Sequence, residues 1–357
     1  MKKLAKGVIW AAGIILVIFL LAAAVFATFG KAIVVSQIEK NLKVKAALGR
    51  AILSFPLSVT LDKLEIQGLL KADSVSLSPS VLGFLAGKIV LNELKIINPE
   101  ITISRGNDGK LNLPQLEAKG KQPPLLLAGL KIQNGTAVFR DKKIAPEGEG
   151  YRLVVKDINV SISKITFPPT SLYTNFAVSA SLDDNENRPS GKALASGWID
   201  FRPKDMDGKI KLSDIPVAAL APYLGNMFPV KRFLSAKLNF SAELKAKNND
   251  LTAKCHAEFI SEPKKVDSVE PGGDLVPDLV NLFSDTSGKI TFDFTIPTKL
   301  DNPRFDLINL KGIIGQAAAH NIASQPPENV VEKVKDIAEQ FKDIGKDLKD
   351  IFKKKEE

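Results

Sequence analysis

The most uniform stretch of the chain is the apolar run from Val8 to Phe29, which carries no charged residue and follows a short lysine-rich segment. About 20 apolar residues in an α-helix cross the hydrocarbon core of a bilayer. The run therefore predicts a transmembrane anchor over residues 1–30, with its lysines on the cytoplasmic side and the remaining chain across the membrane. A cleavable signal peptide with a cleavage site near Ala22–Ala24 is the alternative, although the apolar region of a signal is normally shorter.

Beyond this run the spacing of apolar residues changes twice. From Ala32 to about Leu48 they recur at helical spacing among lysines, which predicts a juxtamembrane helix over residues 31–50. After Gly49 apolar and polar residues alternate, and turn-forming segments interrupt the alternation at short intervals. In strands with this alternation, one face packs on apolar groups and the other face is exposed to water. Residues 51–323 are therefore predicted to be mainly β, with antiparallel strands and a few short helices.

Alternation alone leaves two arrangements of these strands open. In a β-sandwich the apolar faces of two sheets bury each other, whereas in an open sheet one apolar face stays uncovered and lines a groove. The candidate groove-lining residues are apolar residues that sit two apart in the clearest alternating segments. They are Val59, Leu61, Val75, Leu77, Ile101, Ile103, Val160, Ile162, Leu238, Phe240, Phe292 and Phe294.

The C-terminal segment 324–357 has a different pattern. Its apolar residues alternate spacings of four and three on a segment otherwise built from Lys, Asp and Glu, which is a heptad stripe. This predicts an amphipathic helix whose apolar face consists of Val330, Val334, Ile337, Phe341, Ile344, Leu348 and Ile351. Its charges nearly balance, unlike those of a helix that binds anionic lipid. Packing on the chain's own sheet, pairing with a partner helix and lying on a membrane all stay open.

Charge and cysteine content narrow the function classes. The formal net charge of +9 is spread over the chain as scattered lysines. No basic stripe interleaves with aromatic residues, so we predict no binding to nucleic acid. The single cysteine, Cys255, excludes an intramolecular disulfide framework. Hydrophobic packing must therefore hold the exported part together.

The sequence contains no recognisable catalytic or metal-binding pattern. With only His256 and His320, no Ser-His-Asp arrangement can be nominated, and neither a G-x-S-x-G elbow nor a phosphate-binding loop occurs. Cys255 is next to His256, but adjacent residues on a strand point to opposite faces. We interpret this pair as a buried cysteine beside an exposed histidine. The prediction is a protein without enzymatic activity, metal ligands or cofactor.

The order of several segments closely resembles the bacterial AsmA family. Each segment alone is weak, because it consists of apolar alternation and a turn, but their order behind an N-terminal anchor is more specific. They cover most of residues 1–320 and comprise Leu64–Ile66, Ala72–Ser80, Gly87–Ile103, Asp108–Leu113, Leu130–Phe139, Leu212–Leu224 and Leu300–Phe305. The chain is short for the family, and its heptad tail departs from the family pattern.

The resemblance implies a fold and a role. The fold is an elongated, curled antiparallel sheet with an apolar groove. The role is that of a single-pass inner-membrane protein, mostly periplasmic, that shields lipid acyl chains and contributes to phospholipid transport and outer-membrane homeostasis. Its implied partners are phospholipid, the inner membrane and envelope-assembly proteins that contact the C-terminal helix. The alternative is an anchored scaffold or chaperone that regulates assembly of outer-membrane proteins without carrying lipid.

Overall fold

The computed structural model describes residues 2–55, 57–112, 125–145, 148–167, 173–183, 189–220, 233–263 and 289–302. The helices are α1 (Lys2–Leu42), α2 (Val81–Leu85) and the 3-10 helix η1 (Val217–Leu220). The strands are β1 (Ala46–Ala47), β2 (Arg50–Ser54), β3 (Ser58–Ile66), β4 (Leu70–Pro79), β5 (Ile89–Ile97), β6 (Glu100–Arg105), β7 (Leu125–Asp141), β8 (Tyr151–Phe167), β9 (Thr174–Asp183), β10 (Pro189–Asp200), β11 (Asp205–Pro216), β12 (Phe233–Lys247), β13 (Asp250–Pro263) and β14 (Lys289–Lys299). The predicted helix over 324–357 lies outside the described residues.

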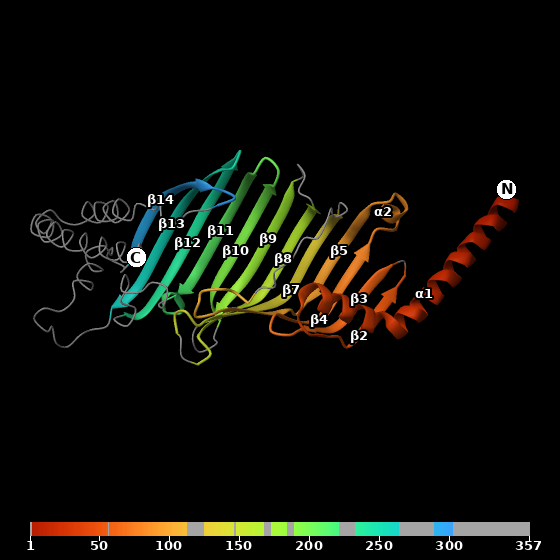
Figure 1. Cartoon of the computed structure of the whole chain (residues 1–357). Coiled ribbons are helices and arrows are strands. Elements are labelled where there is room, and N and C mark those ends of the chain that lie inside the picture. Colours follow the sequence, from red (N-terminus) through yellow and green to blue (C-terminus); the bar gives the residue numbers. More distant parts are fainter. Residues whose placement is uncertain are drawn as a thin grey trace, which may run out of the picture.

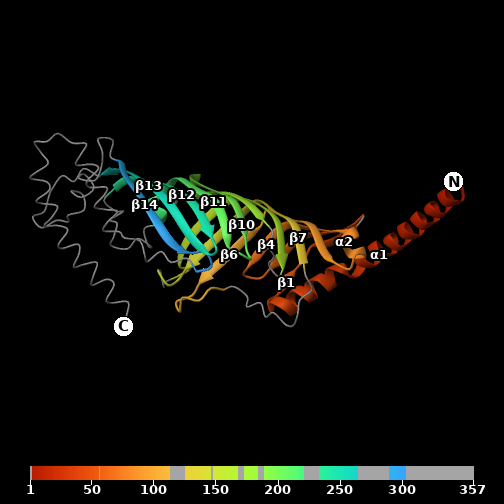
Figure 2. The same ribbon diagram turned by 90° about the horizontal axis from the view of Figure 1, so that it is seen from above.

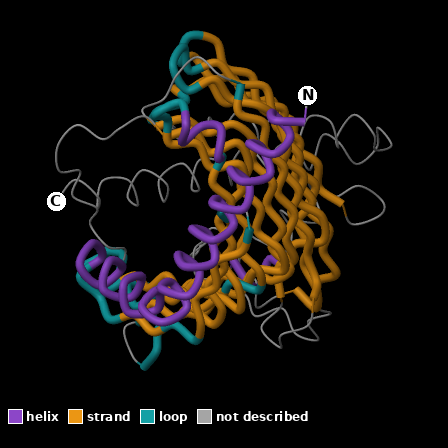
Figure 3. Tube along the Cα trace, turned by 90° about the vertical axis from the view of Figure 1, so that its right-hand side faces the viewer, coloured by secondary structure: helices purple, strands orange, loops and turns teal. Residues whose placement is uncertain are grey.

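The strands form one large curled sheet of 14 strands (Figures 1 and 2). From β7 to β14 the neighbours in the sheet are also consecutive in the chain, as in a series of hairpins. Seen along its length, the sheet bends around a concave side, and the end of α1 lies on that side (Figure 3). The mainly β fold predicted from alternation is confirmed.

Two strand pairs differ from the antiparallel pattern of the rest. Both β5 and β6 run parallel to β7, with Ile96 paired to Ile132 and Thr102 paired to Val138. β5 and β6 are successive parts of one line of chain that is interrupted at Asn98, which has a left-handed φ of 49°. Parallel neighbours cannot be joined by a hairpin. The link from β6 to β7 is therefore not a hairpin, and part of it lies outside the described residues.

Helix α1 combines the predicted anchor and the predicted juxtamembrane helix in one element. Among the described residues, its segment Phe19–Leu42 is long and apolar enough to cross a membrane. The helix ends at Leu42, earlier than the predicted segment 31–50. The reason is local: Lys43 adopts a left-handed φ of 56°, and its amide donates to Glu39 O over 2.9 Å.

The strand register sorts side chains into rows that cross the sheet. Partners across strands point to the same side, and residues two apart in a strand share a face. One row from β2 to β14 is entirely apolar: Ala51, Leu61, Val75, Ile96, Ile132, Val160, Val178, Ala195, Ile210, Ala242, Cys255 and Phe294. The parallel second row holds Leu53, Val59, Leu77, Leu94, Leu130, Ile162, Phe176, Gly197, Gly208, Leu244, Ala253 and Ile296.

These two rows define the apolar face of the sheet. The row between them belongs to the opposite side, which we call the polar face, because adjacent residues on a strand alternate in direction. From β5 to β14 that row reads Lys95, Lys131, Ser161, Ala177, Ser196, Lys209, Glu243, Lys254 and Thr295. Over nearly all its strands, the sheet therefore has an apolar face on one side and a polar face on the other.

The second apolar row has no side chain where β10 meets β11. Gly197 pairs with Gly208, and a Cβ atom on Gly197 would lie 2.3 Å from Asp207 O. The backbone must move to admit a methyl group, so we expect Gly197→Ala to lower the free energy of unfolding by about 1–2 kcal/mol in chemical denaturation. Gly129→Ala is the control, since its Cβ would make an ordinary 3.5 Å contact with Asn92 O. An equal loss of unfolding free energy in both variants would contradict this account.

Candidate functional site

Every predicted groove-lining residue lies on the apolar face. Leu61, Val75, Val160 and Phe294 are in the first row, and Val59, Leu77 and Ile162 are in the second. Leu238, Phe240 and Phe292 are two or four positions from row residues of β12 and β14. Ile101 and Ile103 are on β6, where Ile101 pairs with Leu70, which packs on the buried cluster that contains Leu61 and Val75. Alternation was sufficient to find this face, because residues two apart must share it. Contact of these residues with lipid stays a prediction.

Helix α1 covers the N-terminal end of the apolar face. Leu61 and Val75 are buried in a cluster with Leu48, Ala51, Leu64, Ile66 and Ala72. The helix packs on this cluster through Phe26, Val34, Val35, Ile38 and Leu42. Leu61 and Val75 therefore belong to the protein's own core, and the part of the face that can meet a ligand begins further along the sheet.

The middle of the apolar face is only half-buried. From β7 to β11 the first row consists of Ile132, Val160, Val178, Ala195 and Ile210, and each retains part of its exposed surface. The hydrophobic clusters of the described residues join neighbouring strands to one another, to α1 at one end and to Ala219 of η1. All described strands belong to one sheet, so none of them forms a second layer over this face. Within the described part of the chain, the strands therefore form an open sheet and not a β-sandwich.

Sequence reasoning missed the centre of this face. Ala195 and Gly197 of β10 carry little apolar surface, so their strand lacks a clear alternating pattern. Only strand pairing, which places Ala195 between Val178 and Ile210, shows that these residues lie on the apolar face. In β9 the alternation of Phe176, Val178, Ala180 and Leu182 is a signal that could have identified the region.

A hollow of about 620 Å³ lies at the middle of β7–β11, where the central residue of each strand belongs to the first apolar row. Three consecutive residues of each strand line it, such as Lys131–Gln133 and Lys209–Lys211. The outer two residues of each triplet point to the polar face. They include small side chains such as Ser179 and Ser196. We assign the hollow no ligand, because its lysines are surface residues.

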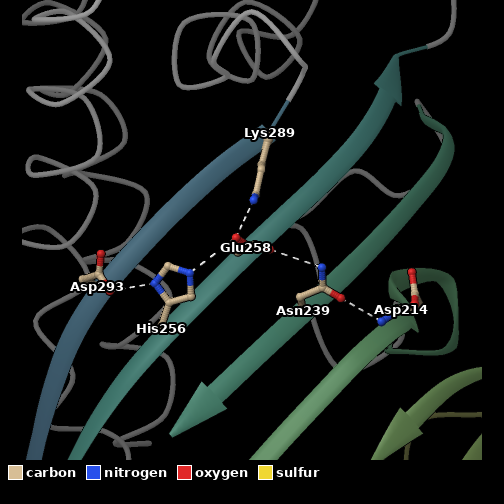
Figure 4. A network of polar contacts seen from close by, with 6 residues as sticks. All are labelled: Asp214, Asn239, His256, Glu258, Lys289 and Asp293. Carbon is tan, nitrogen blue, oxygen red and sulfur yellow. Dashed lines mark hydrogen bonds and ion pairs between the residues drawn. The ribbon is translucent and has the colours of Figure 1, made fainter.

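The sheet separates Cys255 from His256, as alternation predicts. Cys255 is buried on the apolar face, and burial raises the pKa of its thiol. His256 lies on the polar face, where its Nδ1 is 2.7 Å from Asp293 Oδ1 (Figure 4). Glu258 connects His256 to Lys289 and to Asn239. The pair therefore forms no shared site, and the histidine instead links β12, β13 and β14.

This network gives the last strands a pH-dependent stability. The hydrogen bond to Asp293 raises the pKa of His256 above its usual 6.5. A group with a raised folded-state pKa stabilises the fold fully below its unfolded pKa and loses this contribution as the pH rises through the folded pKa. We expect the denaturation midpoint to fall slightly between about pH 6 and about pH 8, and to fall less in His256→Gln. Identical pH profiles of the two proteins would contradict this role.

No family model, no curated protein and no solved structure matches the chain. In the described part of the chain, no group of three or more His, Cys, Asp or Glu side chains is arranged to hold a metal ion. Among the described residues, the apolar face is covered by α1 at one end, is half-buried from β7 to β11, and continues to β14.

Proposed function

We propose that α1 anchors the protein in a bacterial inner membrane and that the apolar face of the sheet, in the periplasm, shields lipid acyl chains. In this role the protein contributes to phospholipid transport and outer-membrane homeostasis. The observation that supports the proposal is the apolar row from Ala51 to Phe294, whose middle stays half-buried among the described residues. Large apolar surfaces that remain uncovered are typical of binding sites.

The energetics of lipid movement explain the need for such a surface. Exposing acyl chains to water costs about 0.8 kcal/mol per methylene. Two chains of about fifteen methylenes each therefore face a barrier on the order of 20 kcal/mol. A protein lowers this barrier by replacing the hydrocarbon surroundings of the chains. Aliphatic and aromatic side chains in continuous rows supply those surroundings without contacting the headgroup.

The dimensions of the row suit this task. Adjacent strands lie about 4.8 Å apart, so the row from β2 to β14 spans roughly 50 Å. The hydrocarbon of one leaflet is about 15 Å thick, so the row is longer than one acyl chain in the bilayer. Such a face accommodates whole chains at several positions along the sheet. The resemblance of the sequence to the AsmA family, whose members are implicated in phospholipid movement, supports the same proposal.

Photo-crosslinking in intact membranes tests the proposal. Benzoylphenylalanine at position 178 faces the apolar side, and the same residue at position 179 faces the polar side. We expect a phospholipid adduct, identified by mass spectrometry, from position 178 and none from position 179. Absence of an adduct at position 178, in protein that also fails to bind lipophilic dye, would refute lipid shielding.

A further inference from the structure

Exposed apolar side chains gather at one edge of the first strands. Phe55, in the turn between β2 and β3, is 68% exposed, and Leu82 and Leu85 of α2 are 79% and 77% exposed. Leu82 and Leu85 are three positions apart, so they lie on the same side of α2. We call Phe55, Leu82 and Leu85 the tip patch. A concentration of large exposed apolar side chains marks a contact surface.

The turn and α2 lie at the same edge of the sheet. β3 begins just after the turn and β4 ends just before α2, and Ser58 Oγ lies 3.1 Å from Ser78 Oγ. The Ser80 amide donates to Val90 O over 2.8 Å, which holds the start of α2 against β5. Both views of the ribbon show α2 at the end of the sheet from which α1 extends (Figures 1 and 2). The tip patch therefore lies at the end of the sheet from which α1 extends.

The tip patch also touches α1 directly. The rings of Phe19 and Phe55 meet edge to face, with centroids 5.4 Å apart and planes at 88°. Phe19 belongs to the uncharged run from Val8 to Phe29. A turn in contact with this run shares its environment. Where α1 enters a membrane, the turn that carries Phe55 is at the membrane too.

Both parts of the tip patch lie in uncharged segments. No Asp, Glu, Lys or Arg occurs over residues 51–61 or over residues 74–87. Charged residues resume toward the opposite ends of β3 and β4, at Asp62 and Asp73, and a lysine, Lys88, follows α2. Charges are unfavourable in hydrocarbon, whereas small neutral residues such as serine are tolerated near the headgroups. The distribution of charge therefore distinguishes a membrane-facing edge from a water-facing one.

We propose that the tip patch inserts into the leaflet nearest the sheet in the membrane that α1 crosses, and so holds the edge of β2–β5 against the bilayer. The inference rests on the proposed anchor but does not require lipid on the apolar face. Phe19 lies ten residues before the end of the uncharged run, about 15 Å along the helix axis, so the Phe55 side chain beside it reaches the hydrocarbon of this leaflet. The strands β2–β5 stay outside the hydrocarbon, because a sheet edge there would leave backbone groups unpaired. Together α1 and the tip patch fix the orientation of the sheet relative to the bilayer.

Fluorescence quenching by spin-labelled lipid tests this contact in the full-length protein. Cys255 is the only cysteine, so Cys255→Ala provides a background for single labels at Phe55→Cys, Leu82→Cys, Leu21→Cys and Leu111→Cys. Each labelled protein is reconstituted in phosphatidylcholine and phosphatidylglycerol vesicles with a nitroxide on the acyl chain. We expect about twofold quenching at positions 55 and 82, and also at position 21 of α1, because all three labels then contact lipid.

Position 111 is the matched control. Leu111 is 48% exposed but pairs with Arg105 at the end of β6, on the opposite edge of the sheet, and we expect no quenching there. Quenching at position 21 without quenching at 55 and 82 would overturn the tip-patch contact and leave the anchor intact. Loss of quenching at all positions would overturn both. Labels at 55 and 82 that are shielded from aqueous iodide yet not quenched by lipid would indicate a protein partner instead, which also overturns the inference.

Discussion

Replacing Ile210 with aspartate is expected to reduce the phospholipid adduct at benzoylphenylalanine 178 by about tenfold or more. Ile210 and Val178 are in the same apolar row, with Ala195 between them. The new carboxylate therefore enters the space that an acyl chain beside position 178 fills. Burying a charge against hydrocarbon costs several kcal/mol, and each 1.4 kcal/mol changes an affinity tenfold. Mass spectrometry of the adduct, normalised to protein in the membrane, measures the effect.

Lys211→Asp is the control for this experiment. Lys211 is the next residue on β11 and lies on the polar face, where it pairs with Ser241. This variant introduces the same carboxylate on the side of the sheet that faces water, and the lipid adduct should persist. Thermal unfolding of both proteins separates loss of lipid from loss of fold. A normal adduct in well-folded Ile210→Asp would refute the apolar face as the lipid site.

Alternation predicted the sheet because the strands are amphipathic in the simplest way. Segments such as Val59 to Leu61 and Phe292 to Phe294 place apolar residues at every second position, and the pleat then puts them on one face. That rule is local, so it needs no knowledge of which strands are neighbours. It also explains the separation of Cys255 from His256, which are adjacent in sequence but face opposite sides.

Features that depend on pairing could not be read from the sequence. The continuity of the apolar row through Ala195 depends on the register of β9, β10 and β11. The parallel placement of β5 and β6 beside β7 depends on where the chain returns. A local pattern specifies the direction of a side chain but not its neighbours. Alternation therefore found the face and missed its centre.

Alternation also cannot tell what covers a face. Leu61 and Val160 have the same pattern in sequence and lie in the same row, yet Leu61 is buried beneath α1 and Val160 is half-exposed. The difference arises because α1 continues past the apolar run, and its last turns pack on the buried cluster that β2, β3 and β4 share, mainly beside β2. The helix that anchors the protein thus also decides where the available part of the apolar face begins.

Ile38→Asp is expected to release the end of α1 from the sheet. Ile38 packs on the buried cluster that contains Leu61 and Leu64. An unpaired carboxylate in this position should lower the free energy of unfolding by about 3 kcal/mol. Because opening is local, hydrogen exchange should speed up in β3 and β4 while β11–β13 keep their protection.

Ile33→Asp separates this effect from a general effect of charge on the helix. Ile33 lies on the same helix but is 53% exposed, so its carboxylate remains in contact with solvent or headgroups. Exchange in β3 and β4 should then stay close to that of the unmodified protein. Equal exchange in both variants would mean that α1 does not cover the apolar face, and the buried state of Leu61 and Val75 would need another cause. Faster exchange only in Ile38→Asp would support α1 as the cover that limits lipid access to the strands beyond β5.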